Sequence, residues 1–173
     1  QAMATTLNSL TRDVQTLRQE TETQMAASVD TLNLAVSSLQ KINDKLGDQQ
    51  SDSATKSALL DQRDRLVSQI AEIVDVRVDY RADDTVSLMT RTGVGILDGK
   101  ASSFSFEPAG AVTADKLFSS DPEKSTVGRL ILTTASGTKL DMVQQGVMQS
   151  GRLAGLVELR DKIGTGDAAE GGG

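Results

Sequence analysis

The feature that most constrains the fold is a regular spacing of apolar residues near the start of the chain. Apolar side chains recur there every three or four residues, which places them on one stripe of a helix. The members are Met3, Leu7, Leu10, Val14, Leu17, Met25, Val29, Leu32, Val36, Leu39, Ile42 (or Asn43) and Leu46. Thr21 stands between Leu17 and Met25, where steps of four form a stutter in the heptad pattern. The spacing predicts one helix of about 66 Å over residues 3–46, a length that suits a rod-like assembly.

A second helix follows a short polar connection. Gly47 is predicted to cap the first helix, and residues 48–52 are polar. Apolar residues then repeat at intervals of seven, as Leu59, Leu66 and Ile73 and as Leu60, Val67 and Val74. The short connection predicts an antiparallel, coiled-coil-like helical hairpin over residues 1–74. Because the second helix covers only half of the first, the remaining ~33 Å of the stripe requires another partner, either helices of the full-length protein outside this chain or neighbouring subunits.

The periodicity changes from helical to alternating at Asp75. Val76, Val78 and Tyr80 alternate with charged residues, which is typical of a half-buried strand. Further strands are predicted at 85–90 after an aspartate turn, at 94–97, around Phe104 and Phe106 on one face, and at 127–133 and 138–142 across a turn at 135–137, with 107–126 irregular. Residues 75–149 are therefore expected to form a small, mainly antiparallel β domain.

The chain is expected to return to helix after Gly151. Leu156, Leu159 and Ile163 have helical spacing, which predicts a short helix over 150–163 that rejoins the helical part. The glycine-rich residues 164–173 are predicted to be a flexible tail. The predicted fold class is thus α+β, with a long helical hairpin joined to a small β domain.

Composition excludes several classes of function. The chain has no His and no Cys, so the usual acid/base group and the thiolate nucleophiles and metal ligands are missing. Its 18 basic residues are outnumbered by 24 acidic ones, which argues against nucleic acid and anionic membranes as partners. Aromatic residues make up only 2%, and these normally dominate ligand pockets. We expect no nucleic acid, membrane or small-molecule partner and no cofactor.

The glycines of Gly93–Ala101 superficially resemble a phosphate-binding loop. A P-loop requires glycine where Val94 stands and Ser or Thr where Ala101 stands. The dinucleotide-binding pattern fails too, because Asp98 replaces its last glycine. We interpret these glycines as turn residues.

Two pairs of carboxylates are the remaining candidates for chemistry. Asp83 and Asp84 are typical of a turn, since Asp accepts backbone hydrogen bonds there. Asp61 and Asp64 fit a solvated helix face, and neither pair has the alternating ligands and fixed glycine of a calcium loop. We therefore predict no catalytic, cofactor-binding or metal-binding residues.

Two segments carry a resemblance to a known family. Leu59–Val67, which leads into Ile73–Val78, and the later run Ser150–Asp161 are similar to the flagellar hook-associated protein 1 family. In that family the first segment ends a long helical hairpin just before the β region, and the second re-enters the helical domain. The resemblance implies that the chain is the central fragment of a hook-filament junction protein, with the terminal assembly helices outside it.

The resemblance also implies a setting and partners. The whole protein would be a structural component of the bacterial flagellum, secreted by type III export and located outside the cell. It would contact the hook protein, the second junction protein and its own copies, and segments outside this fragment would bind the export chaperone. The isolated fragment is expected to be monomeric or weakly associating. The alternatives are another flagellar axial or type III secreted structural protein or adhesin, and a protein-binding module that uses the β domain; an enzyme ranks behind both.

Overall fold

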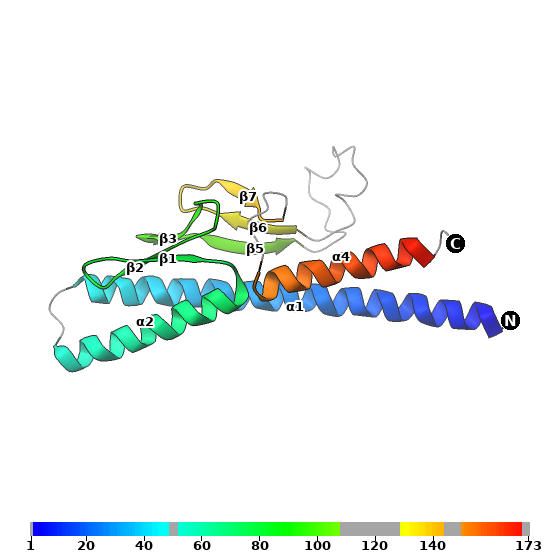
Figure 1. Cartoon of the computed structure of the whole chain (residues 1–173), viewed down its shortest axis with the longest axis horizontal. Coiled ribbons are helices and arrows are strands. Elements are labelled where there is room, and N and C mark those ends of the chain that lie inside the picture. The colour runs from blue at the N-terminus through cyan, green and yellow to red at the C-terminus, as the bar shows by residue number, and fades with distance from the viewer. Residues whose placement is uncertain (1, 49–51, 108–128, 144–149, 171–173) are drawn as a thin grey trace.

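The structure is a computed structural model that describes residues 2–48, 52–107, 129–143 and 150–170. Three helices form one elongated layer, and the strands lie on one side of it (Figure 1). The helices are α1 (Ala2–Gly47), α2 (Ser53–Ile73) and α4 (Arg152–Glu170). α2 lies along the C-terminal half of α1, whereas α4 lies along its N-terminal half (Figure 1). The two shorter helices therefore share the length of the long one.

The strands form two small antiparallel sheets. They are β1 (Arg77–Tyr80), β2 (Val86–Met89), β3 (Gly95–Asp98), β4 (Lys100–Ala101), β5 (Ser103–Glu107), β6 (Arg129–Thr133) and β7 (Lys139–Asp141). The first sheet has the order β1-β2-β3-β4 and the second β5-β6-β7. The predicted α+β class is confirmed, and so is the pairing of the last two strands, in which Thr133 lies opposite Lys139. Residues 108–128, which include most of the segment predicted to be irregular, lie outside the described residues.

α1 is one uninterrupted helix of 46 residues, or about 69 Å. It passes through the stutter at Thr21, whose hydroxyl group donates to the Leu17 carbonyl at 2.8 Å inside the helix. The predicted long helix is therefore confirmed. The predicted glycine cap is wrong: Gly47 is itself helical and is absent from the described residues with positive φ. Helical hydrogen bonding continues beyond it, since the Asp48 N–H donates to the Asp44 carbonyl at 3.2 Å.

The N-terminus of α2 is capped by Asp52. Its carboxylate accepts a hydrogen bond from the Thr55 N–H at 2.7 Å, which satisfies a backbone donor that has no partner within the helix. Hydrogen bonds from the Thr55 side chain and backbone hold the pKa of Asp52 below its ordinary value. The cap therefore stabilises the folded chain in its ionised form.

Replacing Asp52 with alanine should lower stability at neutral pH but have little effect in acid. The Asp52 carboxylate has a lower pKa in the folded than in the unfolded chain, so it stabilises the fold at pH values above the unfolded pKa. This stabilisation is lost as pH falls through the lower pKa of the folded state. Urea unfolding of the wild type, Asp52→Ala and Asp52→Asn at neutral and strongly acidic pH measures the effect. Asparagine caps without titrating, so Asp52→Asn should keep its advantage over Asp52→Ala in acid. A difference between wild type and Asp52→Ala that is the same at both pH values would contradict this.

Helices and sheets share one hydrophobic core. Its fully buried members come from all three helices and from both sheets, and include Met25, Leu32, Leu39, Ile70, Ile73, Leu88, Ile96, Leu97, Leu130, Leu132 and Leu153. Phe104 is buried and Phe106 half-buried on the same strand face, as predicted. This core joins the helical and β parts. The predicted division into segments 1–74, 75–149, 150–163 and 164–173 stays a prediction.

The first strand follows the expectation of a half-buried strand at Val76 and Val78, which are partly buried against the core, but not at Tyr80. β1 begins only at Arg77, and Tyr80, expected on its apolar face, is 60% exposed. Tyr80 instead makes a contact at the surface, in which the Arg63 guanidinium lies 5.0 Å from the centre of its ring. A tyrosine can take part in such a cation–π contact at the surface without burying its ring.

The last helix is longer than predicted. α4 continues through Glu170, whereas the sequence predicted a helix over 150–163 and a flexible tail from residue 164. Once a helix has formed, each further residue adds one backbone hydrogen bond, which offsets the weak preference of Gly164 and Gly166 for helix. Residues 171–173 lie outside the described part of the chain.

Candidate assembly interface

The two sequence segments that carry the family resemblance meet where the chain leaves and re-enters the helical layer. Asp75 follows α2 and is buried, and its Oδ2 accepts a hydrogen bond from the Ser150 N–H at 2.7 Å. The Ser150 hydroxyl group donates to the other oxygen of the same carboxylate. Arg91 places its Nε 3.5 Å from Asp75 Oδ2. One buried carboxylate thus fixes two segments that are 75 residues apart.

Gly151 completes this helix junction, which we define as Asp75, Ser150 and Gly151. Gly151 has a φ of 94°, and its carbonyl accepts the first helical hydrogen bond of α4 from the Gly155 N–H at 3.0 Å. A Cβ atom at Gly151 would lie 2.9 Å from the Ile73 carbonyl oxygen at the end of α2. Only glycine fits both the backbone conformation and the space, so the junction holds the ends of α2 and α4 in contact.

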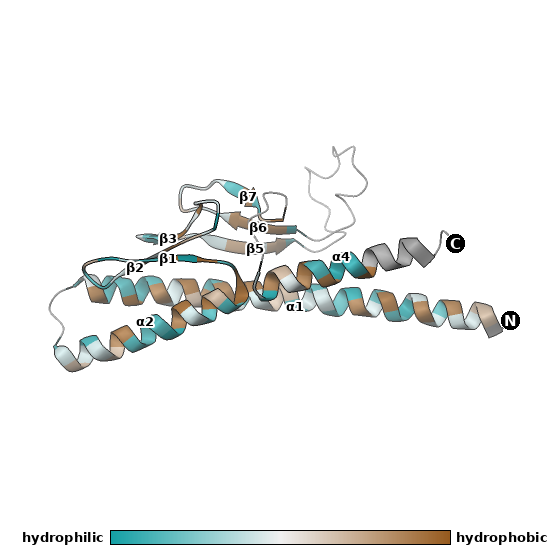
Figure 2. Cartoon of the chain, in the orientation of Figure 1, coloured by the Kyte–Doolittle hydropathy of each residue, from teal (hydrophilic) through white to brown (hydrophobic). Residues whose placement is uncertain are grey.

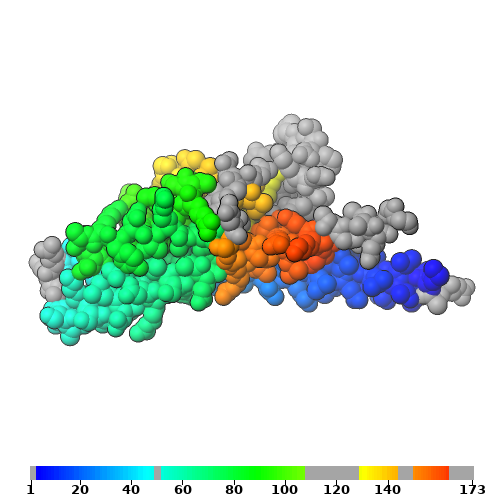
Figure 3. Space-filling view, in the orientation of Figure 1, coloured from blue at the N-terminus to red at the C-terminus, as the bar shows by residue number. Residues whose placement is uncertain are grey.

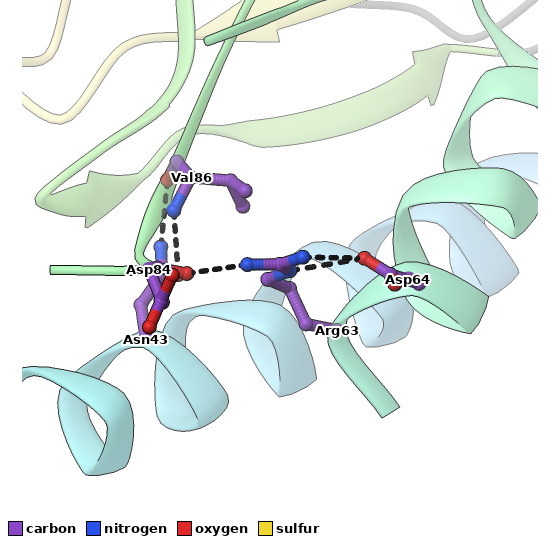
Figure 4. A network of polar contacts seen from close by, with 5 residues as sticks. All are labelled: Asn43, Arg63, Asp64, Asp84 and Val86. Atoms are coloured by element: carbon purple, nitrogen blue, oxygen red, sulfur yellow. Dashed lines mark hydrogen bonds and ion pairs between the residues drawn. The ribbon is translucent and has the colours of Figure 1, made fainter. Parts of the chain in front are cut away.

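A row of side-chain amides on α1 binds the backbone of the β part. Asn33 donates to the Phe104 carbonyl and accepts from the Phe104 N–H, both at 2.7 Å. Asn43 makes the same pair of bonds with Val86, at 2.8 and 3.0 Å, as Figure 4 shows. Gln40 accepts from the Ala101 N–H at 2.8 Å. We call Asn33, Gln40 and Asn43 the amide row.

The amide row protects the open edge of a sheet. β5 is an edge strand in the order β5-β6-β7, and an unpaired edge invites pairing with another chain. Asn33 occupies that edge at Phe104 and supplies both a donor and an acceptor. This function was not predicted from the sequence: spacings of seven and three place the three amides on one side of α1, but their backbone partners have no sequence signature.

Changing Asn33 to aspartate should destabilise the chain by about 1–3 kcal/mol. The carboxylate keeps the acceptor for the Phe104 N–H but faces the Phe104 carbonyl without a proton to donate. Urea unfolding at neutral pH measures the loss. Asn8→Asp is the matched control, because Asn8 is exposed on the same helix. Equal stabilities of the two variants would show that the Asn33 amide contributes nothing.

A polar network attaches α2 to the turn between β1 and β2. Arg63 donates from Nη1 to the Asp84 carbonyl at 2.8 Å and from Nη2 to Asp64 at 2.8 Å (Figure 4). Lys56 forms an ion pair of 3.0 Å with the Asp84 carboxylate. Asp84 has a φ of 68°, which fits the predicted turn.

Asp83, in the same turn, has structural partners as well. Asp83 accepts from the Thr85 hydroxyl group at 2.6 Å and from the Thr85 N–H at 3.1 Å, and these bonds hold the pKa of Asp83 below its ordinary value. Within the described residues, no group of three or more acidic side chains is placed to hold a metal ion. Asp61 and Asp64 are exposed on α2, and Asp64 accepts hydrogen bonds from Arg63. The predicted absence of functional residues at these positions stays a prediction.

Two of the three glycines of the P-loop-like segment, Gly93 and Gly99, lie at turns between strands, whereas Gly95 is the first residue of β3. Gly93 has a φ of 89° and donates its N–H to the Thr90 carbonyl at 3.0 Å, just before β3. Gly99 has a φ of 76° between β3 and β4. A P-loop would instead lead from a strand into a helix. The interpretation as turn glycines agrees with this geometry at Gly93 and Gly99 and is wrong at Gly95.

The N-terminal half of α1 carries an exposed apolar stripe. Met3, Leu7, Leu10 and Leu17 are 79%, 61%, 52% and 49% exposed, and we call them the free stripe. Further along α1 the stripe is buried from Met25 onward, where α2, α4 and the sheets cover it. Figure 2 shows apolar residues at intervals along the N-terminal half, and in Figure 3 the N-terminal end of α1 (blue) extends beyond α4 (orange to red).

α4 corrects one part of the sequence prediction. The half of the stripe left uncovered by α2 was expected to need a partner outside the hairpin, and α4 of the same chain supplies part of it through Leu153, Leu156 and Val157. The free stripe still extends for about 21 Å along α1. No helix in the described residues is both long and apolar enough to cross a membrane. The exposed apolar surface is therefore a candidate for contact with other helices.

Comparisons with known proteins agree with this architecture. The sequence profile of the flagellar hook-associated protein FlgK helical domain matches residues 1–170. Among solved structures, the flagellar hook junction protein FlgK from Burkholderia pseudomallei is similar over 86% of this chain, with a TM-score of 0.66 and 19% sequence identity. The chain spans 25% of the length of that protein. No curated protein matches significantly. Because the profile covers nearly the whole chain, the chain belongs to the flagellar hook-associated protein FlgK family.

Proposed function

We propose that this chain is the helical section of a hook-filament junction subunit and acts as a structural part without catalysis. The observation that carries the proposal is the free stripe on one continuous helix. A compact enzyme domain would bury these side chains, whereas a subunit of an assembly leaves them for neighbouring helices. The solved structure with the similar fold is named as a hook junction protein, which supports the same role.

The internal contacts suit a mechanical role. α1 has no break over 46 residues, and α2 and α4 are held against it end to end by the helix junction. The amide row and the common core fix the β part to the same helix. A force applied to one end of α1 would therefore be shared by the whole unit. We propose contacts of the full-length protein with the hook protein, a second junction protein and its own copies, a chaperone-binding segment elsewhere in the protein, and a location on the extracellular flagellum.

Localisation of the full-length protein tests the proposal. Antibodies raised against this chain should label the hook-filament junction of detached flagella in electron micrographs, and cells without the gene should lack filaments. Full-length protein with Leu7→Glu and Leu10→Glu should fail to restore filaments, because the charges cannot be buried between helices. The matched double control is Thr11→Glu and Asn8→Glu, on exposed positions outside the free stripe. Labelling away from the junction, or normal filaments with the stripe variant, would overturn the proposal.

A further inference from the structure

The P-loop-like segment ends in a turn that is open to a covalent change of the backbone. Asp98 is the last residue of β3 and lies directly opposite Lys100, the first residue of β4, so Gly99 alone forms the turn. Gly99 has a φ of 76°, close to that of the central residue in a classic γ-turn, which is rare and strained. The strain favours a change that lengthens the turn. Asp98–Gly99 is also the sole Asp–Gly pair in the sequence, which has no Asn–Gly pair.

The Asp98 carboxyl carbon and the Gly99 nitrogen belong to adjacent residues and are unobstructed. The Asp98 side chain is 60% exposed. A Cβ atom on Gly99 would meet no atom within 4 Å, and glycine has no side chain of its own to hinder a reaction at its nitrogen. Within the described residues the Gly99 N–H donates no hydrogen bond. A bond between the carboxyl carbon and this nitrogen would close a succinimide ring.

An ion pair with Arg81 opposes this ring closure. The Arg81 guanidinium donates from Nη2 to Asp98 Oδ1. The reacting form of the side chain is the neutral acid, so the carboxyl group must first give up this ion pair. Both side chains are exposed, by 47% for Arg81 and 60% for Asp98. An ion pair between exposed groups is weak, so it slows the reaction by no more than about fivefold.

We propose that Asp98 is a site of spontaneous isomerisation to isoaspartate. The Gly99 nitrogen attacks Cγ of the protonated Asp98 side chain, an N–Cγ bond forms, and the carboxyl hydroxyl group leaves with the Gly99 proton as water. Water then opens the succinimide. Attack at Cγ restores aspartate, whereas attack at the main-chain carbonyl carbon of Asp98 breaks its bond to the Gly99 nitrogen. The chain then runs through the Asp98 side chain, with its composition unchanged and without any oxidant or cofactor.

The longer backbone would weaken the attachment of β4 to α1. Ala101 donates its N–H to Gln40 of the amide row at 2.8 Å, and the Ser102 hydroxyl group donates to the Gly95 carbonyl at 2.6 Å. An additional main-chain carbon at Asp98 shifts Ala101 away from its partner Leu97 in β3 and strains both bonds. The amide row would thereby lose one of its connections to the β part. The change is local to this turn, so it does not depend on the proposed function.

Ageing of the purified chain tests the proposal. After incubation at mildly acidic pH and physiological temperature, an isoaspartate-specific methyltransferase labels the product, and mass spectrometry with electron-transfer fragmentation locates it. Asp98 should be the main site. Asp98→Glu is the matched control, because it keeps the charge facing Arg81 but would have to close a larger ring, which forms far more slowly. Equal labelling of the two proteins, or labelling mainly at another residue, would overturn the proposal.

The restraint by Arg81 is tested in the same assay. Arg81→Gln should raise the initial rate of isoaspartate formation at Asp98 by about two- to fivefold. Arg77→Gln is the matched control, since Arg77 is exposed in β1 and forms no ion pair with Asp98 in the described part of the chain. Circular dichroism shows that both variants fold. A rate in Arg81→Gln that is no higher than in Arg77→Gln would show that the ion pair does not restrain the reaction.

Urea unfolding of the aged samples measures the effect on the fold. Aged wild-type chain should unfold at a lower urea midpoint than fresh chain, whereas aged and fresh Asp98→Glu should have the same midpoint. Aged wild-type chain that carries isoaspartate and unfolds like the fresh chain would contradict the predicted loss of the contact between Ala101 and Gln40.

Discussion

Replacing Gly151 with alanine is expected to destabilise the chain by about 2–4 kcal/mol. Two costs add at this position. A φ of 94° is rarely adopted by residues with a side chain, and the new Cβ would lie 2.9 Å from the Ile73 carbonyl oxygen. That oxygen belongs to the backbone, so it cannot turn aside as a flexible side chain could. The ends of α2 and α4 would have to separate, and the hydrogen bond from Ser150 to buried Asp75 would be strained with them.

Gly155→Ala is the matched control for Gly151→Ala. Gly155 lies in the same helix, and a Cβ there would meet no atom within 4 Å. Because alanine favours helix more than glycine does, this variant should be more stable than wild type by about 0.5–1 kcal/mol. Urea unfolding followed by circular dichroism measures both. If the two variants moved in the same direction, the contact between the helix junction and α2 would be unimportant for stability.

Sequence periodicity was sufficient to predict the main helices. The spacing from Met3 to Leu46 predicted one helix, because a stripe with steps of three and four has only one regular interpretation. Thr21 was the weakest point, and the structure shows why it holds: its hydroxyl group bonds within the helix and leaves no polar group unsatisfied. The sequence was also sufficient to predict the turns at Asp84 and Gly93. Both residues have positive φ angles, which Asp and Gly tolerate better than most residue types.

Contacts between distant segments could not be read from spacing. The amide row bonds to backbone atoms, which carry no sequence signature at Phe104 or Val86. The partner of Asp75 lies 75 residues away, so only the fold brings it to Ser150. The same limit explains the role of α4, which was predicted as a short return helix. Its position beside the N-terminal half of α1 decides how much of the stripe stays exposed, and no local pattern contains that information.

Burial in the structure separates the apolar stripe of α1 into a covered part and an exposed part. From spacing alone, the whole half of the stripe that the second helix leaves uncovered, ~33 Å, is a candidate for a partner outside the hairpin. Burial divides the stripe: Met25 and the later members are covered within the chain, whereas Leu7, Leu10 and Leu17 are not. The candidate surface for assembly is thereby reduced to one end of α1.

Replacing Leu39 with alanine is expected to cost about 2–5 kcal/mol and to unfold helices and sheets together. Leu39 is 0% exposed in the core that joins all three helices to both sheets, so its loss leaves a cavity at their common centre. Leu34→Ala is the matched control. Leu34 lies on the same helix but is 71% exposed, and its truncation should change stability by no more than about 0.5 kcal/mol.

Two spectroscopic signals can show whether the Leu39 effect reaches the β part. Circular dichroism reports the helices, and fluorescence reports β1, because Tyr80 is the sole tyrosine and the chain has no tryptophan. With one shared core, both signals should shift to the same lower urea midpoint in Leu39→Ala. If only the helical signal shifted, the β part would be an independently stable domain. The helical section would then lack the rigid connection on which its proposed role in transmitting force depends.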